Sequence, residues 1–297
     1  MELRQLRYLD AIARRRSFTS AAQELHVAQS ALSQQVQRLE RELGVELLRR
    51  TTRRVEVTDA GEVVLARVRR TLAEVDGLRA DLDAISGLMR GRLRLGGVPP
   101  IGDLHPAVLV AEFTRAHPGV NVTVHEDVAF ALLGQLHDGT LDLVIALVAH
   151  EAHDALDGVR LLDDELVLIT APQHRLARAK HVRVDRLSGE PVVAYGSGSA
   201  LRDVLTGLMP DSRIVAEAND QVTIRELVAG GLGVSLMPRS VVAAHDASLA
   251  IRPLTPRQTV PISLIWRAGE RPTPAAEAFR AHVLAAVHSG RTAPRRA

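Results

Sequence analysis

Apolar residues in the first fifty positions recur with the spacing of short amphipathic helices. One inward face is formed by Leu6, Leu9, Ile12 and Ala13, and a second by Phe18, Ala21, Ala22 and Leu25. Ser17 precedes the second set as an expected N-cap, and residues 26–28 form a three-residue turn. A third helix is predicted from about Gln29 to Leu43, ended by Gly44. Two short helices joined by such a turn indicate a helix-turn-helix.

The third predicted helix has two different faces. Its inward arc holds Leu32, Val36, Leu39 and Leu43, and its outward arc holds Ser30, Gln34, Gln37 and Arg41, flanked by Ser33 and Arg38. Ser and Gln are unusual on a solvated face, where Glu and Lys form helices better. Because Gln can bond adenine through two atoms, the pattern favours a reader of the major groove, although an ordinary surface helix also keeps polar residues outside. The candidate base-reading residues are Gln29, Ser30, Ser33 and Gln34, and Arg38 is a further candidate DNA-contacting residue of the same helix.

Residues 45–57 combine β-forming side chains with arginine. Thr51-Thr52 lies at the expected turn, and Arg49, Arg50, Arg53 and Arg54 lie on either side of it. This pattern predicts a basic β-hairpin, or wing, that contacts phosphates or the minor groove. Its candidate DNA-contacting residues are Arg50, Arg53 and Arg54.

From Thr58 to about Leu88 the pattern predicts one long helix. Apolar residues recur in steps of three and four at Val64, Val68, Leu72, Val75, Leu78, Leu82, Ile85 and Met89. Thirty residues at ~1.5 Å each make a rod of roughly 45 Å. A lone helix of that length has one apolar stripe and no core of its own, so we expect it to pair with another chain.

Beyond Gly91 strands and helices alternate. Strands are predicted at 92–96, 120–124, 141–147, 192–195, 214–218, 234–238 and 261–266, and helices at 102–117, 129–137, 221–229 and about 274–288. Repeated β-α units favour an α/β fold, an open sheet with helices on both faces that binds ligands at the carboxyl ends of its strands.

Charge is unevenly distributed along the chain. Residues 1–58 hold 11 Arg and no Lys against 7 acidic residues, whereas the remainder holds 26 basic and 28 acidic residues. A basic N-terminal segment followed by a slightly acidic remainder is typical of a nucleic-acid-binding module joined to a non-binding one. A codon bias toward arginine would give the same excess of arginine. We find neither a signal-peptide h-region nor the roughly 18 apolar residues of a membrane helix, so we expect a cytoplasmic protein without membrane contact.

The sequence holds few candidates for catalysis or metal binding. It has no cysteine, which excludes disulfides, thiolate metal sites, cysteine nucleophiles and thiol-based redox sensing. Gly196-Ser197-Gly198-Ser199 does not match a nucleophile elbow, and the only lysine, Lys180, is not in a phosphate-binding loop. His150 and His153 lack an evident third metal ligand. We therefore expect no enzyme, metal or cofactor; the rival interpretation is a solute-binding protein or enzyme with a helical N-terminus.

Three segments carry a family resemblance. The run from Ser17 to Ser33, the run Leu39-Glu40-Arg41-Glu42-Leu43-Gly44, and Arg50–Arg54 ahead of Thr58-Asp59-Ala60-Gly61 are together similar to the signature of the LysR-type transcriptional regulators. Two departures are small: Ser30 stands where the family usually has proline, and Leu48 where it usually has phenylalanine.

The resemblance implies a three-part architecture. Residues 1–58 would form a winged helix-turn-helix, 59–89 a linker helix that pairs antiparallel in a dimer, and 90–297 a two-lobed domain of the type 2 periplasmic-binding-protein fold. Lobe I would comprise 90–161 and 267–297, and lobe II 162–266. The implied function is a sequence-specific transcriptional regulator switched by a small-molecule effector between the lobes. The implied partners are an inverted repeat in double-stranded DNA, a second copy or a dimer of dimers, and RNA polymerase.

The resemblance also carries a set of effector-contacting positions onto this sequence. They are Pro99, Pro100, Ile101, Ala129, Phe130 and Leu147 in lobe I, and Gly196, Ser197, Gly198, Asp220 and Gln221 in lobe II. Family members that sense organic acids often carry Ser, Thr or Arg where this chain has Pro100, Ala129 and Leu147. We therefore expect a more apolar pocket, which disfavours a small carboxylate effector. The sequence leaves open the effector, the target genes, and activation against repression.

Overall fold

The computed structural model describes residues 1–50, 55–85, 89–97, 104–147, 155–242 and 247–289. The chain divides into two compact units. The N-terminal unit comprises Met1–Leu88 with Asp138–Thr140, and the C-terminal unit comprises Met89–His137 and Leu141–Ala297. The helices in the described part of the chain all lack the combination of length and hydrophobicity that a membrane crossing needs.

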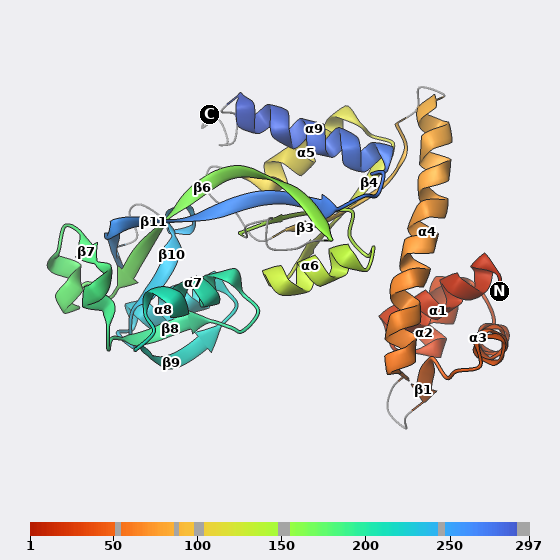
Figure 1. Cartoon of the computed structure of the whole chain (residues 1–297), viewed down its shortest axis with the longest axis horizontal. Helices are drawn as coiled ribbons and strands as arrows, with labels where there is room; N and C mark the ends of the chain where they lie inside the picture. Colours follow the sequence, from red (N-terminus) through yellow and green to blue (C-terminus); the bar gives the residue numbers. More distant parts are fainter. Residues whose placement is uncertain (51–54, 86–88, 98–103, 148–154, 243–246, 290–297) are drawn as a thin grey trace. The chain divides into compact units, whose positions relative to one another are not determined.

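The N-terminal unit begins with three helices and a hairpin (Figure 1). They are α1 (Leu3–Arg15), α2 (Phe18–Glu24), α3 (Gln29–Leu43), β1 (Leu48–Arg50), β2 (Val55–Val57) and the long α4 (Asp59–Ile85). Ser17 caps α2 by accepting a hydrogen bond from the Ser20 N–H, and Gly44 ends α3 in the left-handed region with φ 72°. Strands β1 and β2 pair antiparallel, with Leu48 opposite Val57. The predicted helix-turn-helix and hairpin are therefore both present.

One core joins these elements. Its buried residues include Leu6, Leu9, Ile12, Phe18, Ala21, Leu32, Val36, Leu39, Leu47, Val55, Leu65 and Val68. The predicted inward residue Leu43 is instead 40% exposed, so that prediction was wrong. Leu43 is the last residue of α3, and the chain leaves the helix at Gly44 before the periodicity can bring another turn against the core.

Thr58 and Gly61 fix the start of α4 against the hairpin. The Thr58 Oγ1 accepts from the Gly61 N–H at 3.0 Å and donates to the Glu46 carbonyl at 2.6 Å. A Cβ added at Gly61 would lie 2.7 Å from Val57 Cγ1 and closer still to the Leu47 carbonyl oxygen. Only glycine permits this close approach of helix to wing.

The apolar stripe of α4 divides into two parts. Leu65 and Val68 are buried in the core of the N-terminal unit, and Leu72 packs partly against it. Further along the same helix Leu78 is 62% exposed and Leu82 is 58% exposed. The helix thus has a half that is packed within its own unit and a half that presents apolar side chains outward.

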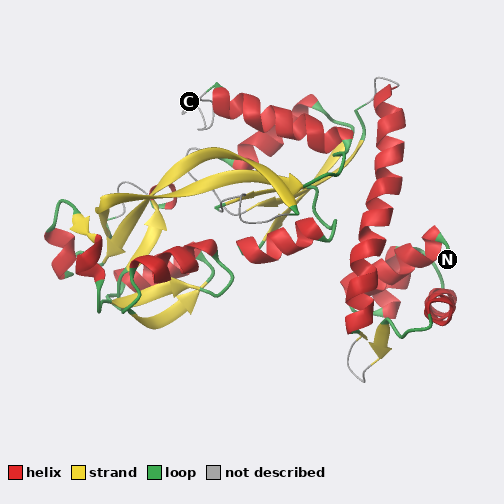
Figure 2. Cartoon of the chain, in the orientation of Figure 1, coloured by secondary structure: helices red, strands yellow, loops and turns green. Residues whose placement is uncertain are grey.

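The C-terminal unit is built on a seven-stranded mixed sheet with the order β10-β6-β11-β5-β3-β4, to which β7 is added beside β11. Figure 2 shows the strands in yellow and the helices in red. Its strands are β3 (Gly91–Gly97), β4 (Val120–Glu126), β5 (Leu143–Ala146), β6 (Leu156–Thr170), β7 (Val182–Arg183), β10 (Ser235–Pro238) and β11 (Ala250–Arg267). A second parallel pair is formed by β8 (Pro191–Tyr195) and β9 (Arg213–Ala218). The helices are α5 (Pro106–Ala116), α6 (Ala129–His137), α7 (Ala200–Leu208), α8 (Gln221–Ala229) and α9 (Pro274–His288), with short 3-10 turns at η2 (Arg175–Arg178) and η3 (Val184–Leu187).

Two long antiparallel strands join the lobes of this unit. Strands β6 and β11 pair from Thr170 opposite Ala250 to Leu156 opposite Arg267. In Figure 1 they run from the lobe that contains β3, α5, α6 and α9 to the lobe that contains β8, β9, α7 and α8. The mixed α/β, two-lobed fold implied by the family resemblance is confirmed, whereas β6 and α7 were absent from the sequence prediction and β11 is much longer than predicted.

Candidate nucleic-acid interface and interlobe site

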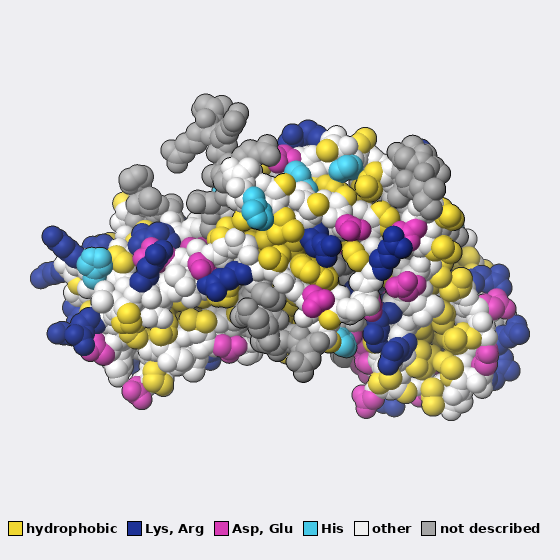
Figure 3. All heavy atoms as spheres, turned by 45° about the horizontal axis from the view of Figure 1, so that its top comes forward, with side chains coloured by type: hydrophobic (Ala, Val, Ile, Leu, Met, Phe, Trp, Pro, Cys, Tyr) yellow, Lys and Arg dark blue, Asp and Glu magenta, His cyan; other side chains and the backbone are white. Residues whose placement is uncertain are grey.

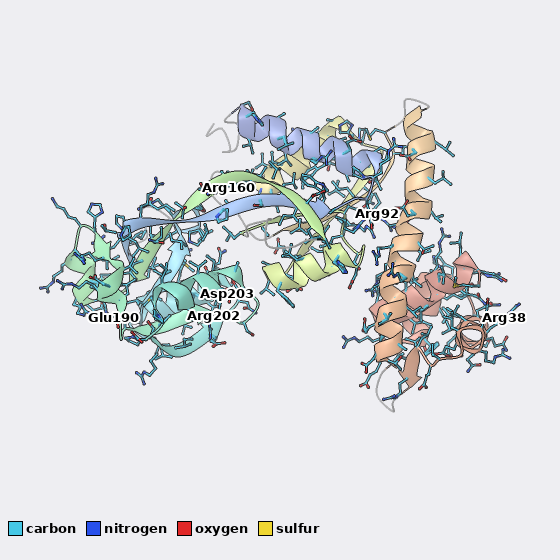
Figure 4. The ribbon with its side chains drawn as sticks, in the orientation of Figure 1. Arg38, Arg92, Arg160, Glu190, Arg202 and Asp203 are labelled. Carbon is cyan, nitrogen blue, oxygen red and sulfur yellow. The ribbon has the colours of Figure 1, made fainter. Side chains whose placement is uncertain are left out.

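The outward face of α3 presents most of the predicted DNA-contacting residues of this helix. Gln29, Ser30, Gln34 and Arg38 are exposed, and Ser33 is half-buried. Figure 4 shows the Arg38 side chain on the side of α3 turned away from the other helices of the unit. Because Leu32, Val36 and Leu39 are fully buried on the opposite side, burial of this apolar edge fixes which way the polar residues point.

A carboxylate that sequence reasoning missed joins α3 to the wing. Glu40 Oε1 accepts hydrogen bonds from the backbone N–H groups of Leu47 at 2.9 Å and Leu48 at 3.1 Å. Its position on the helix resembles that of any surface glutamate, so only the fold reveals its partners. These two bonds fix the start of β1 relative to the outward face of α3.

The wing is described in part. Arg49 is exposed, and Arg50 is the last residue of β1. The predicted phosphate-contacting residues Arg53 and Arg54 lie outside the described residues.

A network of ion pairs holds α1 to α2 and α4. Asp10 accepts from Arg14 Nε at 3.1 Å and from Arg69 Nε at 3.0 Å. Glu24 pairs with Arg15 at 2.6 Å and with Arg14 at 2.8 Å. The hydrogen bonds from Arg15 and Arg14 hold the pKa of Glu24 below its ordinary value.

This network predicts a pH-dependent contribution of Glu24. A carboxylate whose folded-state pKa is lowered stabilises the fold above its unfolded pKa, and that stabilisation is lost as the pH falls through the folded-state pKa. We expect Glu24→Gln to reduce the free energy of unfolding by about 0.5–1 kcal/mol at pH 7, because it removes both ion pairs. The effect stays small because both arginines are partly exposed.

Urea unfolding followed by circular dichroism at pH 7 and at pH 3 tests this expectation. The difference between Glu24→Gln and the parent should shrink at pH 3, whereas Glu74→Gln, on an exposed acid of α4, should have little effect at either pH. An equal difference at both pH values would exclude the titration of Glu24 as the cause.

Two of the predicted effector-contacting residues meet between the lobes. The Phe130 N–H, at the start of α6, donates to the Gly198 carbonyl at 3.2 Å. Gly198 has φ 86°, and a Cβ built there would lie 3.6 Å from Phe130 Cβ and 3.7 Å from Val128 Cγ2. The Phe130 side chain is 75% exposed beside this bridge. The lobes are therefore in direct backbone contact at the loop that follows β8.

The other predicted positions differ in their surroundings. Ala129 and Leu147 are buried, and Ser197 is exposed. The Asp220 carboxylate caps α8 by accepting from the Thr223 N–H and Oγ1, both at 2.8 Å, which lowers its pKa, and Gln221 is the first residue of that helix. Pro99, Pro100 and Ile101 lie outside the described residues.

Arg202, which contacts the end of β8 before the loop 196–199, already has two partners. Arg202 Nη1 donates to the Tyr195 carbonyl at 2.8 Å and pairs with Glu217 at 2.9 Å; Figure 4 labels it on α7. Tyr195 itself is buried, its hydroxyl has no partner in the described part of the structure, and burial raises its pKa. Arg202 is thus a positioning residue for the end of β8.

No cluster of three or more His, Asp or Glu side chains suited to a metal ion occurs among the described residues. His150 and His153 lie outside those residues.

Comparison with known proteins places both units. Residues 3–62 match the family described as bacterial regulatory helix-turn-helix protein, lysR family, and residues 86–287 match the LysR substrate binding domain. The chain is 33% identical over 276 residues to the hydrogen peroxide-inducible genes activator of Dickeya chrysanthemi, covering 91% of this chain and 90% of that protein.

Solved structures of whole regulators are similar as well. A cysteine-to-aspartate variant of full-length OxyR from Pseudomonas aeruginosa superposes with a TM-score of 0.77 at 26% identity, covering 100% of this chain and 99% of that one. Full-length CbnR in complex with its target DNA gives a TM-score of 0.64 at 26% identity, covering 95% and 99%. With a DNA-binding unit and a substrate-binding unit both matched, this chain belongs to the LysR family of DNA-binding transcriptional regulators.

Proposed function

We propose that the chain recognises an inverted repeat in double-stranded DNA by inserting the start of α3 into the major groove. The observation that supports this most is the exposed edge of Gln29, Ser30 and Gln34 at the leading end of a helix whose other side is buried. Residues at that end of a recognition helix reach base edges, and glutamine can bond adenine through two atoms. Arg38, with Arg50, Arg53 and Arg54 of the wing, would contact phosphates.

Gln34→Ala tests the base-reading role. Binding to the operator should weaken by about 1–3 kcal/mol, and binding to unrelated duplex should stay within about 0.5 kcal/mol of the parent. Fluorescence anisotropy with both duplexes at several salt concentrations measures the two effects. Gln23→Ala, an exposed glutamine of α2, is the matched control and should change neither affinity. Equal losses on both duplexes would show that Gln34 contacts only the backbone.

We infer that the signal enters as a small molecule bound non-covalently between the lobes. A relative is a hydrogen peroxide-inducible activator, and a similar solved structure carries a substitution of a cysteine. This chain has no cysteine, so thiol oxidation cannot carry its signal. The buried Ala129 and Leu147, and the engagement of Arg202 with Glu217, favour a ligand of low charge.

We also propose that the chain acts as a dimer, or a dimer of dimers, in the cytoplasm and contacts RNA polymerase at its promoters. The exposed Leu78 and Leu82 on α4 support the self-association. Two recognition helices on one symmetric dimer would match the two halves of an inverted repeat.

A further inference from the structure

Basic side chains gather at one end of the C-terminal unit. Residues 90–297 contain 22 Lys and Arg against 22 Asp and Glu, but residues 171–190 alone contain five basic residues against two acidic ones. Figure 3 shows Lys and Arg side chains clustered at the left end of the molecule, where Figure 1 places β7. On η2, η3, the segment between them and β11, the side chains of Arg178, Lys180, Arg186 and Arg257 are exposed; we name these four residues the basic platform.

The platform stands on a well-packed base. Strand β7 pairs with β11, with Val182 beside Leu254 and Arg183 beside Thr255, which brings the β11 residue Arg257 toward the segment 175–187. Arg252 Nε on β11 donates to the Ala177 carbonyl of η2 at 2.8 Å. The side chains beneath, Leu176, Val182 and Leu187, are buried. The segment that carries Arg178, Lys180 and Arg186 is therefore packed against β11, the strand that carries Arg257.

The acidic residues of this region are already paired. Glu190 binds Arg175 and lies 3.3 Å from His174, Asp185 pairs with Arg183 at 2.6 Å, and Glu165 pairs with Arg239 at 2.7 Å. Among the described residues none of the four platform cations forms an ion pair within 4.0 Å, although Arg257 helps to lower the pKa of Glu165 and Arg186 that of Asp185.

The platform lacks the features of a protein-binding surface. Specific protein interfaces are centred on buried apolar or aromatic anchors. None of the exposed large hydrophobic side chains of the described chain lies in residues 171–190 or 250–258. Phosphate, by contrast, needs only correctly placed cations, and three of the four are arginines, whose guanidinium forks suit phosphate oxygens.

We propose that the basic platform of lobe II binds the phosphate backbone of double-stranded DNA flanking the operator, as a second, sequence-independent DNA contact of this regulator. The proposal rests on operator binding by the N-terminal unit, which holds DNA at high effective concentration for any further cationic surface of the same assembly. Such a contact would add affinity and salt dependence without adding base specificity.

The test compares two duplexes and two triple variants of the full-length protein. One duplex is trimmed to the footprinted operator, and the other extends it by about three helical turns (~100 Å) of unrelated sequence on each side. Arg178→Gln/Lys180→Gln/Arg186→Gln removes three platform charges. Arg115→Gln/Arg213→Gln/Arg271→Gln removes three exposed charges elsewhere on the same unit. Affinity is measured by anisotropy across a salt series.

The platform variant should bind the long duplex about tenfold or more weakly at 0.1 M salt, with the slope of log K against log salt reduced by about one for each phosphate that the variant no longer neutralises. Its affinity for the trimmed operator should be unchanged, and the control variant should match the parent on both. If the unmodified parent does not bind the trimmed operator, the result refutes operator recognition by the N-terminal unit and not the basic platform.

Parent-like slopes on the long duplex would refute the platform. So would parent-like DNA binding with impaired transcription in a purified system, because that result assigns the platform to an acidic protein. Should the triple variant melt at a lower temperature than the parent, Arg178→Gln/Arg257→Gln provides the same test with fewer changes.

Discussion

Leu78→Glu/Leu82→Glu should produce a folded, monomeric chain whose operator affinity is lower by about 10²–10⁴-fold. Both side chains are more than half exposed on α4, and neither is needed by the core of its own unit. Two carboxylates would make an apolar seam between paired helices unfavourable, because each charge would lose its hydration. A monomer presents one recognition helix, so it loses the avidity that comes from engaging two half-sites at once.

Sedimentation velocity and anisotropy on the operator measure the two parts of this expectation. Leu232→Glu makes the same chemical change at a side chain 44% exposed in the C-terminal unit and should leave assembly and affinity intact. An intact dimer in the double variant would remove α4 from the interface. Leu72 is unsuitable for this test, since it packs partly against the N-terminal core and its replacement would also destabilise that unit.

The sequence predicted those elements whose signals are local. Periodicity and the Gly44 stop place α3 at Gln29–Leu43, and the Ser17 cap places the start of α2 at Phe18, as the structure has them. The division of the α4 stripe was not predictable, because all its apolar residues share one helical period. Which of them face the unit's own core depends on contacts with α1 and β2 that no spacing within the helix contains.

Two elements escaped prediction for the same physical reason. In β6 the acidic run Asp163-Asp164-Glu165 interrupts the apolar alternation, and the strand is stabilised by pairing with β11, nearly a hundred residues away. Helix α7 has nine residues and follows the glycine-rich loop 196–199, so its short apolar pattern was not recognised. Both depend on tertiary packing rather than on local propensity.

The candidate site was predicted unevenly for a related reason. The family resemblance predicted that Phe130 of one lobe and Gly198 of the other both line the effector site. In the structure the two residues are joined by a backbone hydrogen bond. It also proposed Asp220 as an effector contact, but that carboxylate accepts two hydrogen bonds from Thr223 at the start of α8. The Oδ2 atom of Asp220 is therefore engaged in capping the helix.

Locking the lobes together should abolish the effector response, and the geometry at Gly198 supplies the means. A Cβ at Gly198 would lie 3.6 Å from Phe130 Cβ, within the range of about 3.5–4.5 Å that a disulfide requires. Because the chain has no other cysteine, Phe130→Cys/Gly198→Cys can form only this disulfide within one molecule. The cost is backbone strain of about 1–2 kcal/mol, since Gly198 has φ 86°.

The response is measured as the ratio of operator affinities with and without the compound that a thermal-shift screen selects. In the oxidised double variant the ratio should fall to about one, and reductant should restore it. An effector shifts the regulator only through a difference in affinity between two arrangements, and the disulfide removes one of them. Gly198→Cys alone controls for strain, and Phe130→Cys alone controls for loss of the aromatic ring. An oxidised variant that responds like the reduced one would show that the signal passes without separation of Phe130 from Gly198, and the switch would then have to act through another part of the domain.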